Sequence, residues 1–467
     1  MKDEGNRICA RRMIWAAGEL ASPLLVGSGE NEDTDMDLIT APEGTYMIPG
    51  SSLAGAMRAY LTKSLGKEKA DFLFGNRNRE GIRDGGEIDY QSSIFVYDVM
   101  LKDGVKAKRN GVRLDCRKTA EELSRYDMQI LEPGAKFWIR LELTVRERRI
   151  ETSAKEALEE SFALLCDCLS GMENGVLRVG AKSRRGYGKL HIAGVSYCDF
   201  IMDREEDFQK WLDFDWNRLP DEQKSRKSVP KERKDHCLRI PLKVKDTILI
   251  RDYYLKPMGK GGVYLDYGQL VRKDERETAV IPGSSWAGAV RSYLAHVVQE
   301  AGKMESWETA QEALEPFFGT WKTKGKEKLE SSKLLFEESK LTAAKAGEGY
   351  ADLSRNSIDR LFGGTVNGAL YHERIWAGGE TELVIRWQDK EMGDCLQEVL
   401  YGLLYWVICG LYEGFLTVGG ETAVGRGAFE CPKGKEPELD GTAFQPENAA
   451  AAIKWFRNRE EHNGKNS

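Results

Sequence analysis

The sequence predicts an α+β protein built from two tandem copies of one domain, and three observations support this fold class. An eleven-residue string occurs twice, as IPGSSLAGAMR at residues 48–58 and as IPGSSWAGAVR at residues 281–291. A glycine-rich loop occurs at residues 179–192 and again at residues 418–429. In both halves a strand with alternating apolar and polar residues precedes an apolar helix pattern. Such a duplication, with small changes in spacing, indicates one fold copied with loop insertions.

The composition is typical of a globular protein that stays outside the membrane. The chain has 467 residues, enough for two ordinary domains, and is 41% hydrophobic and 31% charged. Its longest apolar stretch, about residues 399–412, contains Gly402 and Gly410 and predicts a buried helix. Residues 1–7 lack the apolar core of a signal peptide. The nine cysteines form no CxxC pair, which predicts reduced thiols and a cytoplasmic location.

Charge and histidine content argue against several classes of function. The formal net charge is −6, which argues against a free-standing binder of bare polyanions. Basic stretches at residues 102–118 and 182–189 still permit local contacts with nucleic acid. The five histidines lie far apart in the sequence, so neither a zinc site nor a ribonuclease with a histidine pair is supported.

A polar loop with three alternating acids, Asp33, Asp35 and Asp37, precedes the first repeated string. Carboxylates in an irregular loop could coordinate a hard cation such as Mg²⁺. A solvated surface loop is the ordinary alternative, and the twelve-residue ligand pattern of an EF-hand is missing.

Each repeated string predicts the end of a strand followed by a helix. Ser51 and Ser284 follow Ile-Pro-Gly and are suitable N-caps. Apolar residues then recur at helical spacing, and Arg58 and Arg291 point away from that buried face. The unpaired N–H groups and the positive end of the helix dipole suit a phosphate. If the string occurred once, an ordinary capped helix would explain it. Because it occurs twice, we favour a functional role such as phosphate binding.

A long, weakly patterned segment interrupts each half after the first helix. These segments are residues 99–132, with the string RNGVR, and residues 338–375, with the string RNSIDR. A segment of this length inside a compact domain is typically a functional loop or hairpin. The arginines of the two strings are Arg109, Arg113, Arg355 and Arg360.

The glycine-rich loop of the first half carries basic side chains among its glycines. These are Lys182, Arg184, Arg185 and Lys189. Glycines allow close approach to a phosphate chain, the basic groups supply counter-charge, and Tyr187 could stack on a base. The spacing matches neither a Walker loop nor a dinucleotide-binding motif. The second loop retains only Arg426 and has Glu421 in place of Lys182, which predicts weaker binding of RNA by this loop.

The order of elements predicts the domain boundaries. Residues 217–236 are polar, contain two prolines and read as a linker between a first domain at 1–216 and a second domain at 237–445. Residues 446–467 form a tail that is helical at first and then polar. Each half follows the order β–α–β–insertion–β–α–β, which is that of a ferredoxin-like or RRM-like domain.

Together, the repeated strings, the SRRGYG loop and the RN strings resemble the RAMP superfamily. The resemblance is to the Cas-seven-type backbone subunits of type III CRISPR effector complexes, and the two copies resemble the fused subunits of the type III-D branch. It implies two modified RRM domains whose insertions, residues 99–132 and 338–375, are thumbs that displace a base pair. The implied partners are guide (CRISPR) RNA, complementary target RNA, and neighbouring backbone, large and small subunits of the complex, with no membrane contact.

The resemblance also implies roles for individual residues. A loop Asp would cleave target RNA beside the displaced base with a divalent metal, Mg²⁺ or Mn²⁺. Asp35 fits the family spacing best, with Asp33 and Asp37 as reserves, and Asp266 lies at nearly the same distance before the second string. The implied RNA contacts are Ser51, Ser52, Arg58, Arg109, Arg113, Lys182, Arg184, Arg185, Tyr187, Ser284, Ser285, Arg291, Arg355, Arg360 and Arg426.

The sequence departs from the family pattern at Ala54 and Ala287, where a lysine is usual, so one charge contact is lost in each half. Two functional classes therefore stay open. The chain is either a metal-dependent endoribonuclease subunit or a structural guide-RNA scaffold in which one or both halves have lost cleavage. A repeat-RNA processing enzyme of the same superfamily is a third possibility, disfavoured by the lack of a histidine cluster and by the two insertions.

Overall fold

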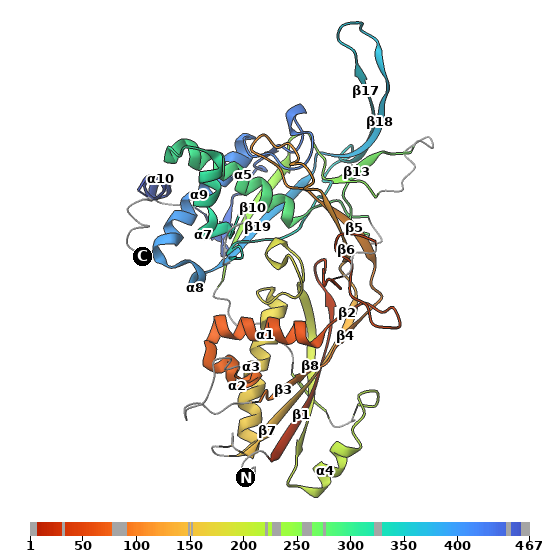
Figure 1. Cartoon of the computed structure of the whole chain (residues 1–467), viewed down its shortest axis with the longest axis vertical. Coiled ribbons are helices and arrows are strands. Elements are labelled where there is room, and N and C mark those ends of the chain that lie inside the picture. The colour runs from red at the N-terminus through yellow and green to blue at the C-terminus, as the bar shows by residue number, and fades with distance from the viewer. Residues whose placement is uncertain are drawn as a thin grey trace.

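The computed structural model shows two α+β lobes, one for each half of the sequence, stacked along the long axis of the molecule (Figure 1). The first half forms the lower lobe in this view, and a long hairpin projects from the upper lobe. The structure describes residues 7–29, 33–76, 91–147, 150, 153–219, 223–226, 235–254, 264–273, 277–321, 329–444 and 450–458.

The main sheet of the first half is antiparallel and runs in the order β2-β4-β7-β1-β8-β9, with β3 also paired to β7, and β5 and β6 form a separate two-stranded sheet. The first strand lies between β7 and β8, as the first strand of a ferredoxin-like sheet does. The elements are β1 (Ile8–Leu20), β2 (Met47–Ile48), α1 (Gly50–Leu65), α2 (Lys67–Phe74), β3 (Ile94–Val96), β4 (Val99–Lys102), β5 (Lys106–Gly111), β6 (Tyr126–Leu131), β7 (Lys136–Arg146), α3 (Ala154–Asn174), η2 (Ser183–Arg185), β8 (Leu190–Ile201), α4 (Glu205–Leu212) and β9 (Lys224–Arg226).

The second half repeats this layout with β10 in the central position. Its sheet runs β15-β19-β10-β21-β22, and β20 pairs with the end of β10, so the predicted fold class is confirmed. The elements are β10 (Asp235–Val244), β11 (Thr247–Ile248), β12 (Arg251–Asp252), β13 (Tyr267–Gln269), β14 (Val280–Ile281), α5 (Gly283–Gly302), α6 (Trp307–Ala313), α7 (Glu315–Phe318), β15 (Leu335–Phe336), β16 (Ser339–Lys340), β17 (Gly349–Ile358), β18 (Thr365–Ala377), β19 (Glu380–Gln388), α8 (Asp389–Met392), α9 (Asp394–Glu413), η3 (Thr422–Val424), β20 (Phe429–Glu430), β21 (Glu438–Leu439), β22 (Thr442–Ala443) and α10 (Ala450–Arg457).

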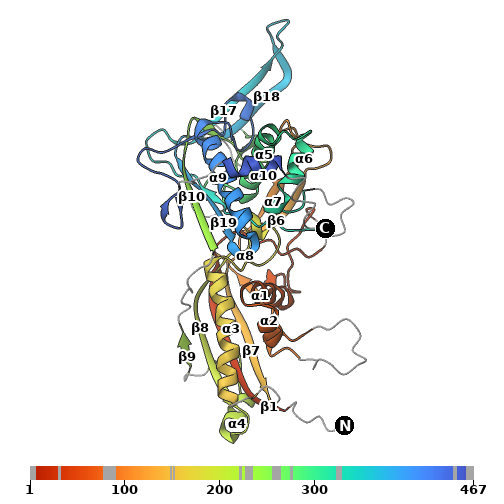
Figure 2. The ribbon, with the colours of Figure 1, turned by 90° about the vertical axis from the view of Figure 1, so that its left-hand side faces the viewer.

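Two long helices pack together beside each sheet, α1 with α3 and α5 with α9 (Figure 2). In both pairs a glycine lies under a tyrosine ring at the contact. A Cβ added to Gly171 would lie 2.7 Å from the ring of Tyr60, and one added to Gly410 would lie 2.5 Å from the ring of Tyr293. The same residue types make the same contact in both halves, which is what a duplicated unit requires.

The repeated strings start their helices two residues earlier than predicted. Helices α1 and α5 begin at glycine, each after an extended proline, and neither has a side-chain cap, so the prediction that Ser51 and Ser284 are N-caps is wrong. In the first half, the N–H of Gly50 donates to Asp98 Oδ1 at 2.7 Å instead. A Cβ on Gly50 would lie 2.2 Å from the carbonyl oxygen of Val96. The glycine therefore allows the helix to start directly against the sheet.

The two insertions form hairpins with different surroundings. The β5–β6 pair, called the first hairpin below, lies against the second half, where Lys118 Nζ donates to Thr417 Oγ1 at 2.8 Å and His296 Nε2 donates to the carbonyl oxygen of Cys116 at 3.1 Å. The β17–β18 pair, called the second hairpin, projects away from the body (Figure 1). The first residues of both segments form strands β4 and β16 rather than hairpin.

The connecting segment and the C-terminal tail also contain regular structure. Strand β9 lies within the predicted linker and pairs with β8. Helix α10 lies within the predicted tail and buries Ala452 and Phe456 against the second core. The rest of the tail, residues 446–449 and 459–467, lies outside the described residues. Across the described part of the chain, no helix has both the length and the apolar character that crossing a bilayer requires.

Candidate functional site

The acidic loop of the first half is fastened to the base of the first hairpin through Asp35. The N–H of Asp35 donates to Asp127 Oδ1 at 3.1 Å, and Asp35 Oδ2 accepts the N–H of Asp127 at 2.8 Å. Asp35 is exposed, and Asp127 lies half-buried on the returning strand β6. The exposed carboxylate is thus held in one place on the surface by a strand.

A residue of the second half completes this site. The hydroxyl of Tyr254 donates to Asp127 Oδ2 at 2.5 Å, and this bond is the main reason that the pKa of Asp127 is lowered. The amide of Asn110 donates to the same hydroxyl at 3.4 Å. Asp127 and Tyr254 were missed in the sequence because neither lies in a repeated string, and only folding brings them beside Asp35.

The two reserve acids have different environments. Asp37 is buried, and its carboxylate accepts the N–H groups of Asp33 and Thr34, each at 3.0 Å. Asp37 therefore closes the loop, and its nomination as a reserve catalyst is wrong. Asp33 is exposed, and its Oδ2 accepts Gln129 Nε2 at 3.2 Å and lies 3.7 Å from Lys106 Nζ.

Asp266 occupies the equivalent place in the second half. Its Oδ2 accepts the N–H of His372 on β18 at 2.7 Å, and its own N–H donates to the carbonyl oxygen of His372 at 2.9 Å. In both halves an exposed Asp therefore accepts a main-chain N–H from the returning strand of the hairpin. The geometry pairs Asp35 with Asp266, and it pairs Asp127 with His372.

The first site suits a divalent cation better than the second. Mg²⁺ is commonly held by one or two carboxylates and keeps several waters. Asp35 and Asp127 supply two carboxylates on neighbouring residues, because each carboxylate accepts the main-chain N–H of the other residue. The second site places one carboxylate, Asp266, beside His372. Among the described residues, no cluster of three or more His, Cys, Asp or Glu is arranged to hold a metal ion.

The two helix N-termini differ in access. Ser51 and Ser52 are exposed at the start of α1, so this part of the helix N-terminus is open, while the N–H of Gly50 donates to Asp98. At α5, the glycine-rich loop of the first half packs against the helix start, and a Cβ on Gly283 would lie 2.6 Å from the carbonyl oxygen of Arg185. Ser284 and Ser285 are half-buried there. Of the two predicted phosphate sites, the structure leaves the α1 site open and covers the start of α5 with protein.

The arginines of the repeated strings are half-buried, and each contacts a partner in its own domain. Arg58 forms an ion pair with Asp71 of α2. Arg291 Nε donates to Gln311 Oε1 at 2.7 Å, and burial lowers the pKa of Arg291 to about 10. Both side chains fasten the long helix to the short helix that follows it. Their role as phosphate contacts stays a prediction, and each would have to contact phosphate while holding its partner within the domain.

Arg109 is buried in the joint between the two halves and is not an RNA contact, which corrects the prediction. Its side chain is 2% exposed and pairs with Glu132 at 3.3 Å and with Glu338 of the second half. Burial opposes the charge, but the carboxylates prevail and raise the pKa of Arg109 well above its usual value. Arg272 Nε also pairs with Glu338 at 2.7 Å. These four residues are called the joint cluster below.

Two other predicted RNA contacts are buried in the same way. Arg426 is 2% exposed and pairs with Glu373 and Glu421, and Arg355 reaches Glu373 at 2.9 Å. Tyr187 is 2% exposed beneath the guanidinium of Arg109, so it cannot stack on a base. The predictions for Arg426 and Tyr187 are wrong because both side chains are buried within the protein. Arg355 is half-buried and forms an ion pair with Glu373.

The basic residues that remain on the surface come from loops and hairpin ends. Lys182 is half-buried, donates to the hydroxyl of Tyr126 at 2.5 Å, and has its pKa lowered by burial. Arg184 is half-buried beside it. The exposed ones among the predicted contacts are Arg113, Arg185 and Arg360.

Comparison with known proteins agrees with this domain arrangement. The family model of the RAMP superfamily matches the chain twice, over residues 19–191 and 258–430. The chain belongs to the RAMP superfamily. A similar solved structure is a cryo-EM structure of the type III-B Cmr-beta bound to cognate target RNA, with 17% identity and a TM-score of 0.31. That match covers 40% of this chain and 60% of the other, and a search of the curated proteins finds no match.

The second hairpin of this RAMP protein has an apolar tip. Leu361 is 83% exposed and Phe362 is 81% exposed in the turn between β17 and β18, and Ile358 is also exposed. Exposed apolar clusters on soluble proteins mark binding surfaces. The sequence located the insertion, but it did not show that these residues stand at its end.

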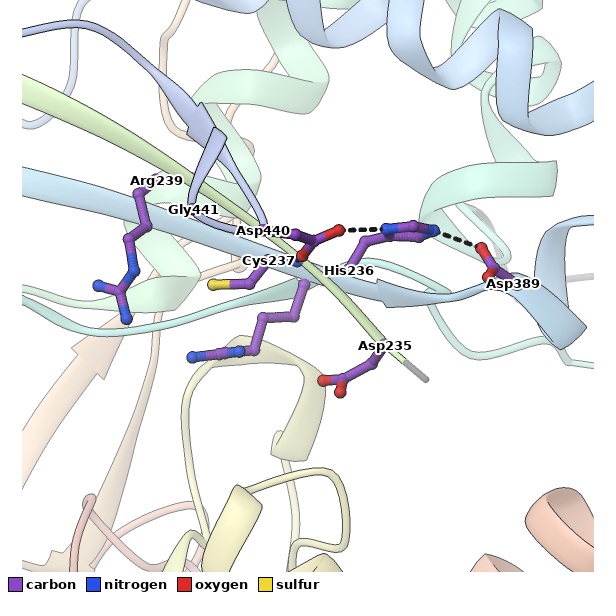
Figure 3. A pocket seen from close by; sticks show the side chains of 8 residues that line it. Asp235, His236, Cys237, Arg239, Asp389, Asp440 and Gly441 are labelled. Atoms are coloured by element: carbon purple, nitrogen blue, oxygen red, sulfur yellow. Dashed lines mark hydrogen bonds and ion pairs between the residues drawn. The ribbon is translucent and has the colours of Figure 1, made fainter. Parts of the chain in front are cut away.

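A pocket of about 600 Å³ at the start of β10 lies in the second RAMP domain (Figure 3). His236 Nδ1 lies 2.6 Å from Asp440, and His236 Nε2 lies 2.6 Å from Asp389. Burial works to lower the pKa of His236, but the two carboxylates prevail and raise it. The arrangement fastens the β21–β22 turn and the start of α8 to β10, and the pocket contains none of the predicted site residues.

Proposed function

We propose that this RAMP protein is a backbone subunit of a type III CRISPR effector complex that holds guide RNA and cleaves complementary target RNA. The observation that carries this proposal is the repeated arrangement of an exposed Asp at the base of a hairpin, Asp35 in the first half and Asp266 in the second. The family match supports the class of protein, and the open N-terminus of α1 supports contact with a phosphate chain.

The joint between the halves supports a backbone role. The glycine-rich loop and first hairpin of the first half both pack on the second half. By repetition, the second hairpin, which projects from the body, is a surface for a neighbouring subunit. A subunit that packs on the first half is expected to differ from this chain. In the joint, Arg109 of the first half pairs with Glu338 of the second half. The equivalent position in the first half is Val99, which offers no carboxylate to a second copy of Arg109.

Cleavage of RNA requires the 2′-hydroxyl to lie in line with the phosphorus and the leaving oxygen, a geometry that a stacked nucleotide lacks. A displaced nucleotide at the hairpin base can adopt it beside Asp35. The Asp35 carboxylate is suited to orient the attacking hydroxyl, because its bond to Asp127 keeps it in place. A divalent metal bound there would stabilise the charge that develops on the phosphate.

The exposed apolar tip of the second hairpin is expected to unstack a base of the guide–target duplex. Replacing both Leu361 and Phe362 with serine should lower target cleavage about 100-fold, because apolar wedges unstack bases and misplaced reactants react slowly. The measurement is the cleavage rate of labelled target RNA by the assembled complex. Guide binding should not change, since both side chains project from the body. An unchanged cleavage rate would contradict the wedge role.

Guide binding is expected to depend on the open start of α1. Replacing Ser51 and Ser52 with aspartate should weaken RNA binding about tenfold by repelling phosphate. Acidic residues in the first turn favour the helix, so unfolding would not explain the loss. Replacing exposed Ala59 with aspartate, on the same helix, is the matched control. Equal losses in both variants, measured by titration at two salt concentrations, would argue against a local phosphate site.

The test of the whole proposal is incubation of the guide-loaded complex with end-labelled matched target RNA, with and without EDTA. The proposal expects discrete cuts that require base pairing with the guide. A complex that binds guide and target but leaves the target intact would instead support a purely structural scaffold. The observation that favours this second candidate is that both Asp carboxylates already accept main-chain N–H groups, which is a structural role.

A further inference from the structure

The second half carries a histidine at the place where the first half carries an acid. Asp35 is bonded to the main chain of Asp127, and Asp266 is bonded in the same way to the main chain of His372. The His372 ring is oriented by Ser354 on the neighbouring strand, whose Oγ lies 2.7 Å from Nδ1. The two halves therefore present different chemistry beside equivalent carboxylates.

The ring of His372 has one nitrogen held and one available. Its Nδ1 is engaged by Ser354, and no hydrogen bond to Nε2 is found among the described residues. His372 is half-buried at the foot of the exposed second hairpin. Such a ring can accept a proton from a group that approaches it from solvent.

The charged groups around this ring are few. Asp266 lies in the bend before β13 and accepts the main-chain N–H of His372. On β17 and β18, Asp352 and Arg374 neutralise each other through bonds of 2.7 and 3.0 Å. Glu373, next in sequence, is buried against Arg426. Among these groups, Asp266 is the exposed acid that is bonded to the main chain of His372.

We propose that His372 is the general base of the cleavage site in the second half, with Asp266 aligning the reacting nucleotide. The inference rests on the proposed function and adds that the two halves cut by different means. The imidazole takes the proton of the 2′-hydroxyl, the 2′-oxygen forms a bond to phosphorus, and the bond from phosphorus to the 5′-oxygen breaks. The leaving 5′-oxygen takes a proton from water. The products are a 2′,3′-cyclic phosphate and a 5′-hydroxyl, and no co-reactant is consumed.

A structural role alone does not account for the pair. Ser354 is exposed, and hydrogen bonds between exposed side chains compete with water and add little to stability. The returning strand of the first hairpin has Asp127 at this place, so the fold does not require histidine there. When Nδ1–H donates to the Ser354 hydroxyl, that bond fixes the tautomer of the ring and leaves Nε2 to accept a proton.

The test uses the guide-loaded complex and maps each cut on the target. The cut that disappears in Asp266→Asn defines the second site. In His372→Ala, the rate at that cut should fall about 100- to 1,000-fold, while the Asp35-dependent cut and guide binding stay unchanged. Added imidazole should restore part of the lost rate. His191→Ala, which removes an exposed histidine bonded to Glu173, is the matched control.

The outcomes separate the inference from the proposed function. An Asp266-dependent cut that persists unchanged in His372→Ala, or a loss that imidazole fails to restore, overturns the role of His372 alone. Absence of any Asp266-dependent cut overturns both the inference and cleavage by the second half. If alanine loosens the hairpin and weakens guide binding, His372→Gln, which keeps a hydrogen-bonding group, must show the same loss with normal binding.

Discussion

Replacing Arg109 with alanine is expected to lower the free energy of unfolding by about 3–5 kcal/mol, because it leaves buried carboxylates without their partner. Glu338 and Glu132 are 4% and 2% exposed, and both form ion pairs with the Arg109 guanidinium. Arg272 would remain beside Glu338 and compensate only in part. The measurement is chemical denaturation followed by tryptophan fluorescence, with the purified chain.

The control for this variant is Arg113→Ala, in the same hairpin. Arg113 is 58% exposed and lies 3.8 Å from Glu121, so its removal should cost less than about 1 kcal/mol. A loss of that small size in Arg109→Ala would mean that the joint cluster does not hold the halves together.

The stability difference should also depend on pH. Burial works to raise the pKa of Glu338, but Arg109 and Arg272 prevail and hold it below its usual value. A group with a lowered folded-state pKa stabilises the fold above its unfolded pKa, and this contribution is lost as the pH falls through the folded value. The difference in the free energy of unfolding between wild type and Arg109→Ala should therefore become smaller as the pH falls through the folded-state pKa of Glu338.

The duplicated fold could be predicted from the sequence because the repeated strings record local backbone contacts. A Cβ on Gly188 would lie 1.9 Å from the carbonyl oxygen of Val179, and one on Gly427 would lie 2.0 Å from that of Val418. Only glycine fits at such places, so the same letters recur wherever the same turn recurs. Even the left-handed backbone is repeated, with φ of 57° at Lys182 and 58° at Glu421.

The roles of the arginines could not be predicted in the same way. The sequence shows a positive charge but not the acid that meets it, and the two can be far apart along the chain. Arg109 meets Glu338 across the joint, and Arg426 meets Glu373 across the hairpin base. Such pairs are set by the packing of whole elements, which no local string describes.

The acidic sites could be predicted from the sequence only in part. The family resemblance, through the spacing to the repeated string, selected Asp35 and Asp266 as candidates, and the structure places each of them at the base of a hairpin. Their neighbours Asp127, Tyr254 and His372 come from hairpins and loops outside the strings. The sequence therefore located the acids but not the groups that would act with them.

Replacing Asp35 with asparagine is expected to lower cleavage at one target position at least about 100-fold while guide and target binding persist. Asparagine keeps an oxygen that can accept the N–H of Asp127, so the loop should stay attached to the first hairpin. What is lost is the charge that orients the hydroxyl or holds a cation. The measurement is the rate of each mapped cut under single-turnover conditions.

Asp33→Asn provides the matched control, since Asp33 is an exposed acid two residues away whose carboxylate contacts Gln129 and lies near Lys106. It should leave every cut in place. If Asp33→Asn removes the cut and Asp35→Asn does not, the assignment within the loop is reversed. If neither does, the first half is a scaffold, and the bond between Asp35 and Asp127 serves only to anchor the loop to the hairpin.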